Sequence, residues 1–175
     1  MNNIGVLYSS KYGNTKRYAE AIGKVLNITP VNIENIKEEE LMPLDTIIYG
    51  SSLYAGAIEK ASMFEAFTDK NLVVFTVGLA SEATTDFQPL LDQNFTKGAQ
   101  ENIKFFHLRV DLNYKTLSVK HRLMMWFLIN VILRKKDTIL EEEYSVLKGS
   151  YGQSLEFYDE KSIEPIIEYV KSINV

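Results

Sequence analysis

The sequence has no cysteine and only two histidines, His107 and His121, among its 175 residues. Without cysteine the chain forms no disulfide bond and holds no thiolate-bound iron–sulfur cluster, no cysteine-rich zinc site and no cysteine nucleophile. The two histidines are too far apart in the sequence to form a metal-binding motif, so we predict no metal site. The apolar segment Leu123–Leu133 is too short to span a bilayer, which takes about 20 apolar residues.

Hydrophobic residues make up 46% of the chain, which is enough for the core of one domain of this length. This composition excludes a disordered or a collagen-like chain. We find no internal repeat and no linker that would divide the sequence, so we predict a single domain over residues 1–175. The first residues lack a basic stretch followed by an apolar one, and we therefore expect no signal peptide and a cytoplasmic protein.

Charge is unevenly distributed along the sequence. The net charge is −4, yet residues 113–136 carry six Lys or Arg and no acid, which leaves −10 on the rest of the chain. An acidic body disfavours nucleic acid as a partner, because phosphate backbones are bound by clustered cations. We predict no nucleic-acid partner.

Short apolar runs alternate with helical stretches in the first part of the chain, which is typical of β-α units on a parallel sheet. The runs are short, rich in Val, Ile, Phe and Leu, and bounded by turn-forming residues. They predict strands at Ile4–Tyr8, Val31–Ile33, Thr46–Tyr49, Leu72–Val77 and Ile103–Val110. Because β-α-β crossovers are right-handed, the pattern indicates an α/β doubly wound sheet with its ligand at the carboxyl ends of the strands.

Apolar residues at helical spacing predict three amphipathic helices that pack on this sheet. The stripes are Tyr18, Ile22, Val25 and Leu26; Phe87, Leu90, Leu91 and Phe95; and Ile163, Ile166, Ile167 and Val170. In the last helix we expect Ser162 to be the N-cap and Pro165 to lie in the first turn.

Polar and small residues fill the junction between the first strand and the first helix. They are Ser9, Ser10, Lys11, Tyr12, Gly13, Asn14 and Thr15. The first amides of a helix have no intrahelical acceptor and point at an anion, and hydroxyl groups add further donors. We interpret the segment as a phosphate loop; the alternative is that its serines and asparagine only cap the helix and end the strand.

Two nucleotide-binding motifs are absent from the sequence, which limits the class of phosphate compound that this loop could bind. Neither Gly-x-x-x-x-Gly-Lys-Ser/Thr nor Gly-x-Gly-x-x-Gly occurs, which disfavours triphosphate hydrolysis and a dinucleotide turn. A response-regulator receiver would need an acidic pair after the first strand and an Asp after the third, where the sequence has Ser9-Ser10 and Gly50-Ser51.

Two further strand ends are built from small residues. The third strand runs into Ser51, Ser52, Leu53, Tyr54, Ala55 and Gly56, and the fourth into Val77, Gly78, Leu79 and Ala80. Accessible backbone with one aromatic side chain is typical of a slot for a flat ring with a phosphate tail. Glycine and serine are also common at the strand ends of any such sheet. The prediction of a ring-binding slot therefore rests on the combination of these two segments with the phosphate loop.

These three segments resemble the FMN-contacting loops of the flavodoxin family, in order and in spacing. The resemblance implies a flavodoxin-like five-stranded sheet in the order 2-1-3-4-5, with FMN as the cofactor. Residues 9–15 would hold the FMN phosphate, and residues 51–56 and 77–80 would surround the isoalloxazine ring. The protein would then set the redox potential of the flavin and choose its electron partner.

A segment before the last helix narrows the resemblance. Residues 117–127 are basic, aromatic and rich in methionine, and they resemble the corresponding part of flavodoxin-like menaquinone-dependent protoporphyrinogen oxidases. This resemblance implies an FMN-dependent oxidoreductase that passes electrons from a reduced substrate to a quinone-like acceptor. A flavodoxin-like electron carrier with a protein partner and a flavin-free scaffold of the same fold are the alternatives.

The segment belongs to an insertion at about residues 113–158, which is too long for a simple connection. Its apolar part is a buried helix, an interfacial helix or a docking surface. Cations at both of its ends favour peripheral contact with the inner face of a membrane.

The two histidines have different predicted roles. We interpret His107 as a hydrogen-bonded structural residue, and a proton-shuttle role for His121 is the weaker hypothesis.

Overall fold

A computed structural model describes residues 3–53, 56–82, 85–113, 118–119, 122–123, 126 and 154–174. It divides the chain into two units, residues 1–110 with 159–175, and residues 111–158. In the second unit β6 (Leu112–Asn113) pairs antiparallel with β7 (Ser154–Leu155). Asp111 Oδ1 accepts hydrogen bonds from the backbone N–H groups of Phe157 and Tyr158, at 2.6 and 2.7 Å.

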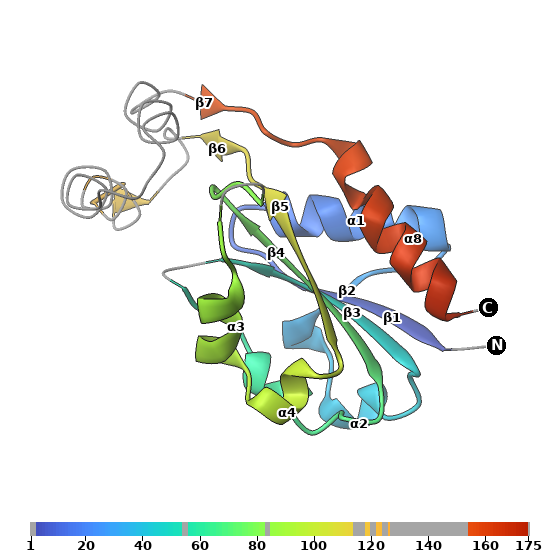
Figure 1. Cartoon of the computed structure of the whole chain (residues 1–175). Helices are drawn as coiled ribbons and strands as arrows, with labels where there is room; N and C mark the ends of the chain where they lie inside the picture. The colour runs from blue at the N-terminus through green and yellow to red at the C-terminus, as the bar shows by residue number, and fades with distance from the viewer. Residues whose placement is uncertain are drawn as a thin grey trace. The chain divides into compact units, whose positions relative to one another are not determined.

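The first unit is built on a five-stranded parallel sheet in the order β2-β1-β3-β4-β5 (Figure 1). The strands are β1 (Ile4–Ser9), β2 (Val31–Asn32), β3 (Thr46–Ser52), β4 (Asn71–Gly78) and β5 (Ile103–Arg109). The predicted fold class and strand order are therefore confirmed. β2 ends one residue earlier than predicted, because the Asn32 side chain accepts from Glu34 N and turns the chain into η1 (Ile33–Asn35).

Helices cover both faces of the sheet (Figure 1). On one face lie α1 (Asn14–Leu26), η4 (Glu160–Ile163) and α8 (Glu164–Ile173). On the other lie α2 (Glu38–Leu41), η2 (Ala61–Phe64), α3 (Gln88–Asn94) and α4 (Lys97–Gln100). The second face buries a core that joins Leu7, Ile47, Tyr49 and Val74 to side chains from these helices.

The three predicted helices are present, with two corrections. Val25 is 49% exposed, so the buried stripe of α1 runs through Tyr18, Ala19 and Ile22 instead. Ser162 is not the cap: Asp159 accepts from Lys161 N and starts η4, and the Ser162 hydroxyl donates to the Asp159 carbonyl. The carboxylate reaches the free amides at this turn, and Pro165 then lies in the first turn of α8 as predicted.

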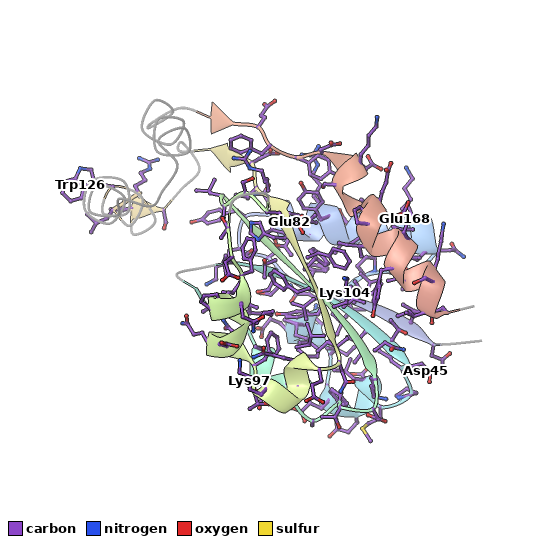
Figure 2. The ribbon with its side chains drawn as sticks, in the orientation of Figure 1. Asp45, Glu82, Lys97, Lys104, Trp126 and Glu168 are labelled. Carbon is purple, nitrogen blue, oxygen red and sulfur yellow. The ribbon has the colours of Figure 1, made fainter. Side chains whose placement is uncertain are left out.

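Side chains also tie the edge strand to α8. Lys104 lies on β5 and is labelled in Figure 2. Its Nζ is 5.7 Å from the centre of the Phe106 ring and 5.6 Å from the centre of the Tyr169 ring on α8. Tyr18 on α1 donates to the Arg109 carbonyl at 2.9 Å and accepts from Asp159 N at 3.4 Å. The carboxyl end of β5 is thereby fixed to the start of η4.

Candidate functional site

The strands reach further into the predicted loops than their apolar runs indicate. Ser9, Ser52 and Gly78 are the last residues of β1, β3 and β4, and they pair with Ser51, Val77 and Arg109. β5, by contrast, is shorter than predicted, because it ends at Arg109 and not at Val110. Small polar side chains are compatible with the ladder because its hydrogen bonds come from the backbone. The predicted site therefore begins on the rigid edge of the sheet.

Gly13 shapes the turn between β1 and α1. Its φ is 88° and its ψ is −14°, a left-handed conformation that glycine adopts without strain, and a Cβ here would have no heavy atom within 4 Å. Gly13 N donates to Ser10 Oγ at 3.1 Å, and Gly13 O accepts from Arg17 N as the helix begins. The first turn of α1 has no acidic residue, which leaves the positive end of the helix dipole uncompensated by a carboxylate there.

Two hydroxyl groups from different segments meet beside this turn. Thr15 Oγ1 in α1 lies 2.9 Å from Ser52 Oγ at the end of β3. In such a pair one hydroxyl donates and the other accepts, and the accepting one keeps its own proton for a further acceptor. Ser10 also keeps its proton, because it accepts from Gly13. Ser10, Thr15 and Ser52 thus form a set of hydroxyl donors suited to an anion.

Ser9 and Ser51 use their hydroxyls differently, and both are buried. Ser9 Oγ donates to Glu59 Oε2 at 2.6 Å, and Ser51 Oγ accepts from Glu59 N at 3.1 Å. The Tyr49 hydroxyl donates to the Glu59 carbonyl. Burial, together with Glu59 and Glu34, raises the pKa of Tyr49, so its hydroxyl stays protonated. Glu59 fastens the segment after β3 to β1 and β3.

A row of buried polar side chains crosses the sheet at this level. Ser9, Ser51, Thr76 and His107 are successive register partners on β1, β3, β4 and β5, and each is at most 6% exposed. Because side chains on paired residues of a sheet point to the same face, all four face the side of α3. The row lies beneath the two segments predicted to hold the ring.

His107 ends this row. Its Nδ1 lies 2.7 Å from Thr76 Oγ1, and its ring stacks on Phe87 with the centres 4.5 Å apart. Burial lowers the pKa of His107 to about 4, against the opposing effect of the Ala80 backbone, so the ring is neutral at pH 7. His107 is the hydrogen-bonded, buried residue that we predicted.

The segments predicted to hold the ring are fixed by backbone and amide contacts. Leu53 N donates to the Val77 carbonyl at 2.9 Å, which joins the ends of β3 and β4. Gly56 has a φ of 79°. Asn94, the last residue of α3, donates to the Gly56 carbonyl and accepts from Ile58 N, both at 2.8 Å. One amide therefore holds both ends of this short turn.

The predicted site residues differ in their exposure. Lys11, Tyr12 and Gly13 are exposed; Ser10, Asn14, Ser52, Leu53, Gly56, Leu79 and Ala80 are half-buried; Ser9, Thr15, Ser51, Val77 and Gly78 are buried. Tyr54 and Ala55 lie outside the described residues. No sequence motif predicts a role for Glu59, Asn94 or Thr76, because the contacts that give these residues a role lie 31 to 50 positions away.

A family comparison decides what this arrangement is. The model described as "Flavodoxin domain" matches residues 5–139. The chain belongs to the flavodoxin domain family. Membership implies FMN as the cofactor of this flavodoxin-like chain. No curated protein matches the sequence.

Solved structures of flavodoxins resemble the chain at low identity. Oxidised flavodoxin 2 from Bacillus cereus is 21% identical, with 62% of this chain and 84% of that one covered and a TM-score of 0.46. A flavodoxin from the domain Archaea is 19% identical over 98% of this chain and 99% of that one, with a TM-score of 0.46. A short-chain flavodoxin associated with a bacterial microcompartment is 19% identical over 63% and 82%, with a TM-score of 0.45.

The donor set fits FMN. The open, left-handed Gly13 allows a phosphate to approach the backbone, and Ser10 together with the accepting hydroxyl of the Thr15–Ser52 pair keeps a proton to donate. The Glu59 carboxylate accepts from Ser9 on the face of the sheet opposite to Thr15 and Ser52. The sheet therefore separates the Glu59 carboxylate from the hydroxyl groups that would hold the phosphate.

Little of the insertion lies within the described residues. Its Glu141-Glu142-Glu143 and His121, like most of residues 117–127, lie outside them. Val119, Arg122, Leu123 and Trp126 are helical and exposed, and Arg122 N donates to the Ser118 carbonyl at 2.9 Å. Among the described helices, none has both the length and the apolar character needed to cross a membrane.

Proposed function

We propose that the chain is an FMN-dependent redox protein in which Ser10, Thr15 and Ser52 hold the flavin phosphate at the start of α1. The observation that carries the proposal is the meeting of Thr15 and Ser52 at 2.9 Å beside the uncapped turn at Gly13. When bound, FMN supplies the ability to accept and donate electrons. The chain's residues bind the phosphate, orient the ring between the ends of β3 and β4, and hold both segments in place.

Titration with FMN and with riboflavin, followed by flavin fluorescence, tests this proposal. Ser10→Asp and Gly13→Asp each place a carboxylate against the phosphate, and we expect a loss of at least about 10-fold in FMN affinity. Riboflavin has no phosphate, so its affinity should change little. Gly98→Asp is the matched control, because Gly98 lies in α4 at the amino end of β5 and a Cβ there meets nothing within 4 Å. Equal FMN affinity in all variants would contradict the proposal.

The finer proposal is an oxidoreductase of the protoporphyrinogen-oxidase type. Its support is the resemblance of residues 117–127 and the exposed apolar and basic side chains described there. The reduced porphyrinogen would be oxidised in successive two-electron steps. In each step one quinone molecule would take up the two electrons and two protons and become a quinol, so the reaction needs no other reactant. Turnover of protoporphyrinogen with menaquinone by the FMN-loaded protein, above a flavin-free control, is the expected result.

An electron carrier is the second candidate, favoured by the acidic body of the chain. Of the acid and base in the buried row and its contacts, Glu59 is bonded to Ser9, and His107 is buried with a lowered pKa. A carrier would reduce a protein partner without turnover of a small molecule. A flavin-free scaffold is the third candidate, and a colourless preparation that does not take up FMN would identify it.

The insertion supports a proposal of peripheral membrane contact. Val119, Leu123 and Trp126 recur at the spacing of one helix face and are 82%, 64% and 47% exposed. Arg122 lies among them, and residues 113–136 carry six cations without an acid. Anionic lipid attracts each such cation by about 1 kcal/mol.

Liposome flotation of the full chain tests this contact. We expect binding to phosphatidylserine-containing vesicles and much weaker binding to phosphatidylcholine alone. Leu123→Asp with Trp126→Asp should abolish flotation, whereas Val25→Asp, which changes an exposed apolar residue of α1, should not. Flotation that survives the double change would rule out this surface.

A further inference from the structure

One polar atom in the buried row is left without a partner. His107 is 3% exposed, and its Nε2 is buried with no hydrogen-bond partner, whereas Nδ1 is bonded to Thr76. A buried polar atom without a partner destabilises the state in which it is found, so such atoms are rare and call for an explanation.

The unpartnered side of the ring faces the end of β4. An ideal Cβ at Gly78 would lie 3.0 Å from His107 Cε1 and 3.5 Å from Nε2. The same Cβ would lie 3.4 Å from Leu53 Cβ. The imidazole therefore lies at the point where the two predicted ring segments meet, and a side chain at Gly78 would press closely against His107.

The rest of the ring is held firmly. Thr76 fixes Nδ1, Phe87 covers one face, and the neutral state leaves one ring nitrogen as a donor. If the Thr76 hydroxyl donates to Nδ1, the proton lies on Nε2. The backbone of Ala80 and Gly78 lies close enough to affect the ring, and the Gly78 carbonyl already accepts from Val110 N at 2.9 Å. A small shift of residues 78–80 would give Nε2–H an acceptor.

We propose that His107 positions residues 78–80 against the flavin ring, through a hydrogen bond from Nε2 to the backbone of this segment that forms when flavin binds. The inference rests on the proposed FMN site. His107 does not touch the reacting atoms; it acts through the segment above it. Because the isoalloxazine ring drives the shift, riboflavin should produce it as well as FMN does.

Imidazole ¹H–¹⁵N spectra of the labelled full chain test the inference on the unaltered protein. On addition of FMN or riboflavin, we expect the Nε2–H resonance of His107 to move to the region of hydrogen-bonded imidazoles and to exchange more slowly with water. A resonance that is unchanged while flavin is bound would overturn the inference alone. A chain that binds neither flavin would overturn the proposed function and this inference together.

Two variants separate positioning from packing. Asn at position 107 reproduces Nδ1 and keeps the bond to Thr76, whereas Gln places its amide near the position of Nε2. We expect His107→Asn to weaken the binding of both flavins by about 10-fold and His107→Gln to leave it within about 2-fold. Equal losses in the two variants would indicate packing only and would overturn the inference. If either variant fails to fold, the spectra of the unaltered chain still decide.

Discussion

Gly50 offers the sharpest test of why the glycines of this site are present. It lies on β3, directly before residues 51–56, which resemble a flavodoxin ring loop, yet its neighbour is the core residue Phe75. An ideal Cβ at Gly50 would collide with Phe75 Cζ, and would lie 2.5 Å from Cε2 and 2.7 Å from Cε1. Carbon atoms in contact prefer separations of about 3.5 to 4.0 Å, and Phe75 is fully buried, so it has no solvent to move into.

The magnitude follows from this overlap. Overpacking of a close-packed core costs about 1 to 3 kcal/mol, and three ring carbons inside the contact distance place Gly50→Ala at the upper end. At about 2 to 4 °C per kcal/mol for a chain of this length, the melting temperature should fall by about 6 to 12 °C. Unfolding by heat and by urea is followed by circular dichroism rather than by tryptophan fluorescence. The reason is that the single tryptophan, Trp126, reports on the unit of residues 111–158.

Gly98→Ala is the matched control for this prediction. Gly98 lies in α4, and a Cβ there meets nothing within 4 Å, so alanine should leave stability unchanged or raise it by up to about 1 kcal/mol. A Gly50→Ala protein as stable as the parent would refute the reasoning that core packing, rather than the flavin, requires this glycine.

Three further predictions concern the supports of the site. Tyr18→Phe removes a buried hydroxyl that joins the Arg109 carbonyl to Asp159 N, and should lower the free energy of unfolding by about 1 to 2 kcal/mol, measured by urea unfolding; no change would show that these bonds are replaced by others. Asn94→Ala frees the Gly56 carbonyl and Ile58 N, so we expect FMN and riboflavin to bind several-fold more weakly in a fluorescence titration, whereas Asp92→Asn, two residues earlier and exposed, serves as the control. His107 has a pKa of about 4 in the folded chain and about 6.5 when unfolded, so the unfolded state binds the extra proton first and stability falls as the pH drops from about 6.5 to 4, by up to about 3 kcal/mol. His107→Asn should remove that part of the pH dependence, and an unchanged profile would contradict the assignment.

The proposal of membrane contact and the proposal of FMN binding rest on different parts of the chain. Residues 1–110 with 159–175 supply every described contact of the flavin site, and residues 111–158 supply the exposed face at Val119, Leu123 and Trp126. A variant of one part should therefore leave the assay of the other unchanged, which makes the two sets of experiments internal controls for each other.

The sequence by itself indicated the strands and helices of the sheet and the segment that we predict to bind phosphate, whereas the strand order came from the resemblance to flavodoxins. Apolar runs of β-strand length and helical stripes are local patterns, and Gly13 with its neighbouring hydroxyls is a contiguous segment, so each is visible without knowledge of the fold. It did not determine the strand ends, because Ser9, Ser51 and Gly78 are held in the ladder by backbone hydrogen bonds from their neighbours rather than by apolar side chains.

Only the tertiary structure decided which hydroxyls lie at the proposed phosphate site and which support the loops. Ser51 and Ser52 are adjacent in the sequence, yet successive side chains of a strand point to opposite faces of the sheet. Ser51 therefore contacts Glu59, and Ser52 contacts Thr15. Likewise Gly50 and Gly78 look alike as residues of small loops, but one makes room for Phe75 and the other for His107. These assignments depend on partners from distant strands, and packing between such segments is a property of the folded chain alone.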